Sequence, residues 1–147
     1  MSYTKTLVAL AAASLATAAL AGDDPRDERH ELMEGVGDAA KVIGAMLKGE
    51  REYDVDAVMD SLDVFDDASS YFGELFPEGT ETGKGTEAAP AIWEDRAGFE
   101  EALQTWRDAT IKAIEAEPAT LEEGKPLLGA VFNGCKNCHD NYRIDDE

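Results

Sequence analysis

The 147-residue chain has only two cysteines and two histidines, and its apolar residues show no strand-like alternation. So few of these residues disfavour a zinc site, which needs about four ligands. A thioredoxin-like redox pair is disfavoured too, because it follows a strand of a βαβ unit. The sequence has no glycine-rich phosphate loop and no nucleophile beside an evident base. We therefore expect a protein that is not an enzyme.

Basic residues are scarce: 13 lysines and arginines stand against 32 aspartates and glutamates, for a formal charge of −19. Such a charge makes nucleic acid and anionic membrane surfaces poor partners. The acidic residues are spread along the chain, which is typical of a solvated surface. Steering of a basic redox partner is the alternative explanation of the same charge.

A long hydrophobic run is missing as well. The N-terminal apolar stretch Leu7–Leu20 is shorter than the ~20 residues that cross a bilayer, so we expect no membrane insertion. With Lys5 before it and an A-x-A sequence ending at Ala21, it is typical of a secretory signal peptide. We expect cleavage after Ala21, which removes residues 1–21 and places a single domain, 22–147, in the periplasm. Loss of Lys5 changes the formal charge to −20.

Both cysteines lie in one C-x-x-C-H motif, formed by Cys135, Cys138 and His139. Two thiols at this spacing on a helical turn can each add to a vinyl group of one haem, and the adjacent imidazole then reaches the iron. A disulfide, a redox pair and half of a zinc site are the alternatives. The zinc alternative lacks ligands, because His30 is the only other histidine. The motif and the export signal together predict one covalently bound haem c.

Apolar residues recur with helical spacing throughout the mature chain, so the sequence predicts an all-α fold. The predicted helices cover residues 25–49, 54–72, 91–116 and 120–143, and a loop without regular structure covers 73–90. Four such helices predict an antiparallel, up-down-up-down four-helix bundle. The residues expected to face inward are Leu32, Val36, Ala39 or Ala40, Ile43 and Met46 or Leu47 in the first helix; Val55, Val58, Leu62, Phe65, Ser69 and Phe72 in the second; Ile92, Phe99, Leu103, Trp106, Thr110 and Ala113 in the third; and Leu128, Val131 or Phe132, Cys135, His139 and Tyr142 in the fourth.

Two helix starts have capping signals. Asp24 followed by Pro25 is typical of an N-cap and a first helical position. Thr120 followed by Glu123 resembles a capping box, although the proline at position 126 makes Lys125 an alternative start.

Four further sequence features stand out. They are Arg29-x-x-x-Met33 in the first helix, Phe-Pro-Glu-Gly-Thr at 76–80, Pro-Ala-Ile-Trp at 90–93, and the C-x-x-C-H motif followed by Arg143. In this order and at these separations they resemble the cytochrome c prime family, whose members are haem-bearing four-helix bundles. The resemblance covers residues 24–143. It implies that Cys135 and Cys138 are the thioether anchors and that His139 is the proximal iron ligand.

The resemblance also implies roles for two arginines. Arg29 would lie beside a haem propionate, where a guanidinium offsets a carboxylate; a solvated position near the helix N-terminus is the alternative. Arg143, one turn after His139, would lie near the proximal imidazole and restrict that side of the haem. His30 is expected to be exposed and not a ligand.

Met33 matches the position that faces the distal side of the iron in this family. In typical cytochromes c prime the side chain there does not bind, and the haem is five-coordinate, high-spin and open to NO and CO. In similar low-spin members a methionine at this position coordinates the iron, which favours electron transfer. We expect a five-coordinate haem that binds NO or CO, transfers single electrons to redox partner proteins, or does both. The alternative is a six-coordinate electron carrier with Met33 and His139 as ligands.

Members of the family commonly dimerise through their first two helices, and the resemblance implies a homodimer here. Apolar and long side chains that a narrow core stripe would leave outside are available in those helices, namely Lys41, Val42, Leu47, Tyr53 and Met59. The high negative charge opposes association at low salt, so we expect a dimer to tighten as salt screens the charge.

Overall fold

The computed structural model describes residues 24–144, and the predicted signal peptide at 1–21 lies outside them. No helix within the described residues has the length and apolar character needed to cross a membrane. The same part of the chain has no named strand; its only β-type pairing is an isolated antiparallel bridge between Ala88 and Arg143.

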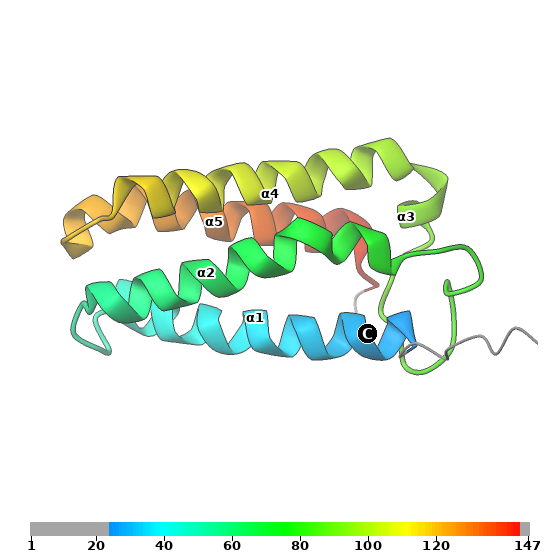
Figure 1. Cartoon of the computed structure of the whole chain (residues 1–147), viewed down its shortest axis with the longest axis horizontal. Helices are drawn as coiled ribbons and strands as arrows, with labels where there is room; N and C mark the ends of the chain where they lie inside the picture. The colour runs from blue at the N-terminus through cyan, green and yellow to red at the C-terminus, as the bar shows by residue number, and fades with distance from the viewer. Residues whose placement is uncertain (1–23, 145–147) are drawn as a thin grey trace, which may run out of the picture.

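Four long helices run along one axis, and consecutive ones point in opposite directions (Figure 1). They are α1 (Pro25–Leu47), α2 (Val55–Tyr71), α4 (Arg96–Ala116) and α5 (Leu121–Tyr142). The short 3₁₀ helix η1 (Phe72–Leu75) and the single-turn helix α3 (Ala91–Glu94) lie between α2 and α4 in the chain. The predicted all-α, up-down-up-down bundle is confirmed.

The helices begin where the capping signals place them. The Asp24 carboxylate accepts a hydrogen bond from the Arg26 backbone N–H at 3.0 Å, with Pro25 at the first helical position. Thr120 Oγ1 accepts from the Glu123 N–H at 3.3 Å. The last helix therefore begins at Leu121, and the alternative start at Lys125 is wrong. Its proline, Pro126, is accommodated inside the helix.

Two parts of the chain differ from the sequence prediction. The single helix expected at 91–116 is divided at Asp95, whose backbone leaves the helical region at φ −126° and ψ 62°. The Asp95 carboxylate accepts a hydrogen bond from the Gly98 N–H at 3.2 Å and so caps α4. The loop expected at 73–90 is not wholly irregular, because it starts within η1 and pairs with the C-terminal residues at Ala88.

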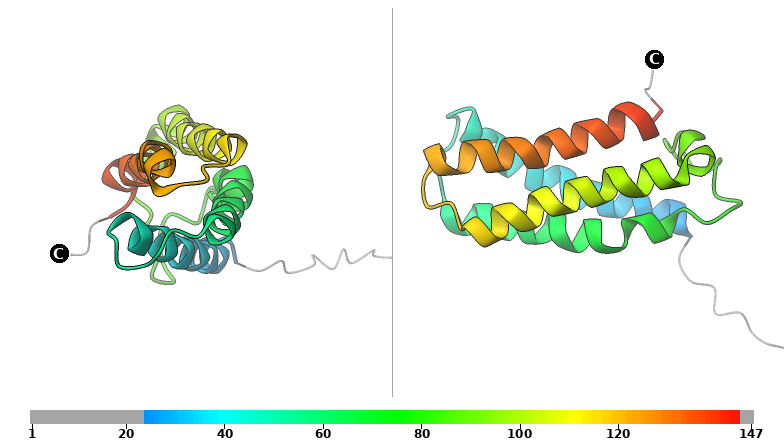
Figure 2. Two further views of the ribbon diagram at one scale, coloured as in Figure 1. Left: turned by 90° about the vertical axis from the view of Figure 1, so that its left-hand side faces the viewer. Right: turned by 90° about the horizontal axis from the view of Figure 1, so that it is seen from above.

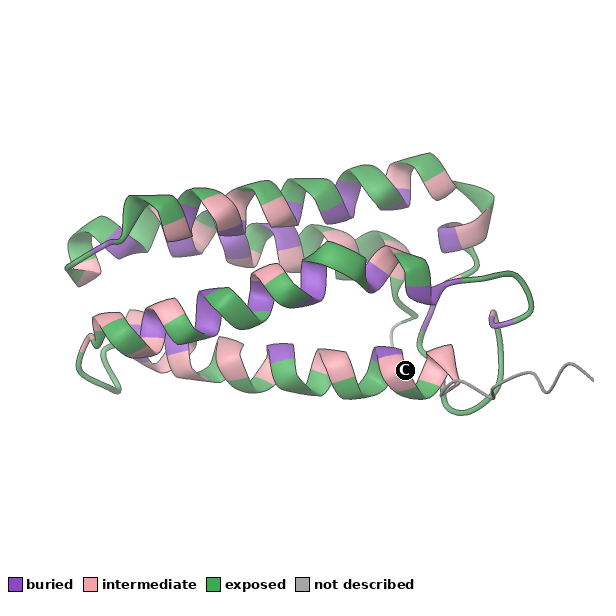
Figure 3. Cartoon of the chain, in the orientation of Figure 1, coloured by how far each residue is buried: buried purple, intermediate pink, exposed green. Residues whose placement is uncertain are grey.

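The inward-facing stripes meet in one apolar core along the bundle axis (Figure 3). Most of the residues predicted to face inward are buried, and several have no exposed surface at all: Ile43, Met46, Val58, Leu62, Phe65, Ala113 and Leu128. The end-on view in Figure 2 shows the four long helices arranged around this core. His139 differs most, since it is exposed. The remaining predicted inward positions are half-buried, namely Leu32, Ala39, Ala40, Val55, Cys135 and Tyr142.

The helices do not pack equally. The α4–α5, α1–α2 and α2–α4 pairs make extensive contacts, whereas α1 and α5 share few. Of the residues proposed for dimer contact, Val42, Leu47, Tyr53 and Met59 are half-buried against the core of this chain. These contacts within one chain do not test the homodimer, which stays a prediction.

Candidate haem site

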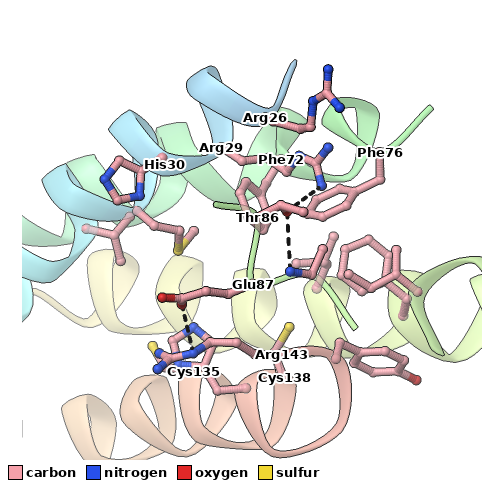
Figure 4. A pocket seen from close by; sticks show the side chains of 18 of the residues that line it. Arg26, Arg29, His30, Phe72, Phe76, Thr86, Glu87, Cys135, Cys138 and Arg143 are labelled. Carbon is pink, nitrogen blue, oxygen red and sulfur yellow. Dashed lines mark hydrogen bonds and ion pairs between the residues drawn. The ribbon is translucent and has the colours of Figure 1, made fainter. Parts of the chain in front are cut away.

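A pocket lies between the N-terminal half of α1 and the C-terminal end of α5, where these helices share few contacts. It has about 940 Å³ of space, part of it open to solvent. Residues 84–88 of the long loop and the aromatic rings of Phe72 and Phe76 complete its wall (Figure 4).

Cys135, Cys138 and His139 all line this pocket from α5. Their spacing places them on one face of the helix, because residues three and four positions apart are neighbours on a helical surface. Both cysteines are half-buried free thiols. Burial raises the pKa of Cys135 to about 11 and that of Cys138 to about 11, so both thiols are neutral at ordinary pH. Partial desolvation and the nearby charge of Arg143 lower the pKa of His139.

The last turns of α5 lie very close to α4. A Cβ atom on Gly134 would lie only 2.9 Å from Trp106 Cα, closer than real side chains approach. Glycine is therefore required for this approach, and it brings the adjacent Cys135 against Trp106, which also lines the pocket.

α1 faces α5 across the pocket with Arg29, Met33 and Val36. Spacings of four and three place these side chains on one helical face. Met33 is half-buried and packs against the core, while Val36 is buried. His30 is exposed at the rim, with Nε2 3.6 Å from Glu34 Oε1. The structure thus places Met33 and His139 in the same pocket, on different helices.

Arg29 is only 6% exposed, which excludes the solvated position that the sequence left open. Its guanidinium donates to Thr80 O at 3.0 Å and lies 4.4 Å from the centre of the Phe76 ring. Within residues 24–144 it forms no ion pair, although Arg26 and Lys84 nearby are paired with Asp24. Burial lowers the pKa of Arg29, as expected for a cation without a carboxylate partner.

An aromatic cluster supports this end of the pocket. The Phe76 ring packs edge-on against Phe72 at 5.1 Å, against Phe99 at 5.0 Å and against Trp93 at 5.9 Å, measured between ring centres. Trp93 thus anchors the loop to α3. The indole N–H groups of Trp93 and Trp106 are buried without a hydrogen-bond partner in the described part of the chain.

The family model of cytochrome c′ matches residues 24–143. The chain belongs to the cytochrome c′ family. It is 38% identical to cytochrome c′ of Rhodopseudomonas palustris over 131 residues, which cover 85% of each chain. It is 33% identical to cytochrome c-556 of Agrobacterium tumefaciens over 121 residues, covering 80% of this chain and 95% of that one. A solved structure of cytochrome c′ from R. palustris superposes with a TM-score of 0.82 at 34% identity and covers 86% of this chain and 100% of that one.

Cytochromes c′ contain covalently attached haem c, and this chain is a c-type haem protein. Its pocket fits such a group. The apolar wall accommodates a macrocycle, two free thiols and an imidazole line one side, and the buried Arg29 charge lacks the anion that a haem propionate would supply.

Several residues of the pocket were not predicted from the sequence, and two of them make polar contacts with predicted site residues. Thr86 lies 3.5 Å from the Arg29 guanidinium, and Glu87 lies 3.1 Å from Arg143 (Figure 4). Both belong to the loop for which the sequence predicted no structure. In a chain with 32 acidic residues, nothing in the local pattern distinguishes Glu87 from the others.

Proposed function

We propose that this member of the cytochrome c′ family is a periplasmic protein that binds NO or CO at a five-coordinate haem iron. Cys135 and Cys138 form the two thioether bonds, and His139 is the proximal ligand. The haem supplies an iron that binds neutral diatomic gases and exchanges single electrons. Export by residues 1–21 would deliver the chain to the compartment in which c-type haem is attached. The proposal assigns binding and electron exchange to the chain, and no catalysed reaction.

The observation that carries this proposal is the apolar character of the wall formed by α1, η1 and α4. Its side chains include Val36, Phe72, Leu103 and Trp106. Such a wall admits small neutral molecules. The acidic and basic side chains that line the pocket come instead from the first turns of α1, from residues 84–87 and from the end of α5.

Met33 supports a second candidate function, that of a six-coordinate electron carrier. It lies in the pocket on the helix that faces α5, and this position supports a role as a second ligand of the iron. A methionine–histidine pair saturates the iron and raises its potential. The similarity to a cytochrome c-556 favours keeping this candidate beside the first.

Arg29 has a further role in both candidates. Its guanidinium is buried beside the pocket without a carboxylate, and a haem propionate would offset that charge. The Thr80 carbonyl and the Phe76 ring hold the guanidinium in place, so the propionate would meet a preformed cationic site.

The test is the absorption and electron paramagnetic resonance spectrum of the haem-loaded protein, with and without NO. We expect a high-spin ferric spectrum that changes when NO is added. Met33→Leu should leave the spin state unchanged, because leucine replaces the methionine at similar volume. Met46→Leu, in the core away from the pocket, is the matched control.

The opposite result identifies the electron carrier. A low-spin wild-type spectrum that becomes high-spin in Met33→Leu, but not in Met46→Leu, would contradict the gas-binding proposal and make Met33 the sixth ligand.

A further inference from the structure

A carboxylate from the long loop meets the end of α5 beside the haem-attachment motif. Glu87 Oε2 lies 3.1 Å from Arg143 Nε (Figure 4). Both residues line the pocket, as His139 does. The side chains of Arg143 and Glu87 are 42% and 49% exposed. An ion pair with this exposure adds little to stability, so its position beside His139 is the feature to explain.

The backbone, and not the ion pair, brings these two residues together. The Ile144 N–H donates to Glu87 O at 2.7 Å, and the Ala89 N–H donates to Tyr142 O at 3.0 Å. Between these bonds, Ala88 and Arg143 form the antiparallel bridge. Removing the Glu87 charge should therefore leave the loop in place, which makes its electrostatic effect separable from folding.

The two charges act on His139 in opposite directions. Arg143, one helical turn after His139, adds positive potential at this end of the pocket, while Glu87 adds negative potential. Asp140, next to His139 on the same helix, adds negative potential as well. Charged groups beyond the first ligand tune a haem iron through such fields and by orienting the ligand. A positive charge near the iron favours the ferrous state, and a negative charge opposes it.

We propose that Glu87 is a positioning residue of the proximal side: its carboxylate holds the Arg143 guanidinium beside His139 and offsets its charge, which lowers the reduction potential of the haem. The inference rests on the part of the proposed function that makes His139 the proximal ligand. It does not depend on Met33, because His139 is a ligand in both coordination states.

The experiment is a redox titration of the haem-loaded full chain carrying Glu87→Gln. We expect the equilibrium constant against a mediator dye to shift toward the ferrous state by roughly threefold to tenfold, the scale expected for a partly exposed charge that solvent screens. The shift should decrease in high salt, because the pair is partly exposed. Glu78→Gln removes the same charge from an exposed position of the same loop outside the pocket and is the matched control.

Two further variants keep the test decisive. Arg143→Gln should shift the equilibrium in the opposite direction, and the double variant should return close to the wild type. The inference is overturned if Glu87→Gln shifts the equilibrium no more than Glu78→Gln, or if the two single shifts have the same sign.

The outcome can be told apart from failure of the proposed function. A low-spin wild-type spectrum would contradict gas binding, while the redox comparison would still decide the role of Glu87. If His139→Gln left the haem spectrum unchanged, His139 would not be the ligand, and this inference would be wrong as well.

Discussion

One end of the bundle holds the connections from α1 to α2 and from α4 to α5. Apolar side chains such as Ile43, Met46 and Leu128, all without exposed surface, close this end. The opposite end buries Arg29 and an unpartnered indole N–H of Trp93 beside half-buried thiols. Apolar side chains pack stably against one another, whereas buried polar groups need hydrogen-bond partners and buried charges need an opposite charge. The first end is therefore complete within this chain, and the second is shaped for a group that brings an anion and a large apolar surface.

Connections reinforce the difference between the two ends. At the closed end, the Tyr53 hydroxyl donates to Pro118 O at 2.9 Å and ties the two short connections together. At the pocket end, the long loop is held by side chains that also line the pocket, including Arg29, Lys84 and Glu87. We therefore expect changes at the closed end to affect stability alone, and changes at the pocket end to affect stability and the haem together.

The largest expected effect comes from matched isoleucine deletions at the two ends. Ile43→Ala at the closed end should lower the free energy of unfolding by about 2–5 kcal/mol, from lost burial and a cavity. Ile92→Ala, equally buried but lining the pocket, should also shift the haem absorption spectrum. Chemical denaturation and absorption spectra measure the two effects. A shifted spectrum in Ile43→Ala would show that the ends are coupled.

A smaller effect is expected where α5 meets α4 beside the pocket. Gly134→Ala forces a Cβ atom to 2.9 Å from Trp106 Cα and should lower the free energy of unfolding by about 1–3 kcal/mol. Because Cys135 is adjacent, the haem spectrum should change as well. Gly129→Ala is the control, since its Cβ meets nothing within 4 Å and alanine favours helix by about 1 kcal/mol. Equal stability of the two variants in chemical denaturation would contradict the close approach.

The smallest effect concerns pH at the rim of the pocket end. Hydrogen bonds from Arg26 hold the pKa of Asp24 well below its ordinary value of 3.8. A lowered folded-state pKa stabilises the fold above the unfolded value, and this contribution is lost as pH falls through the folded-state pKa. The melting temperature of Asp24→Ala should therefore lie below that of the wild type at pH 7, with the gap narrowing below about pH 4. A gap that stays constant down to pH 2 would assign the effect to something other than the Asp24 charge.

The helices and their buried faces could be predicted because their signals are local. The stripe from Phe99 to Ala113 repeats every three or four residues, and each residue in it is buried as expected. The break at Asp95 was missed because helical spacing continues across it; its one local signal is the aspartate three residues before Gly98. The sequence left both a propionate contact and a solvated position open for Arg29, and only the fold shows that its side chain is enclosed.

The haem-attachment motif could be recognised from the sequence alone, because Cys135, Cys138 and His139 lie within five consecutive residues and one helical turn brings them to one face. The shape of the pocket was decided by tertiary structure. Arg29 meets Thr80 across 51 residues of chain, and Glu87 meets Arg143 only because the loop pairs with the end of α5. Such contacts depend on how the helices and the loop pack together, and no local spacing encodes that packing. Burial and charge around the haem site are therefore properties of the fold, while the site for its covalent attachment is a property of the sequence.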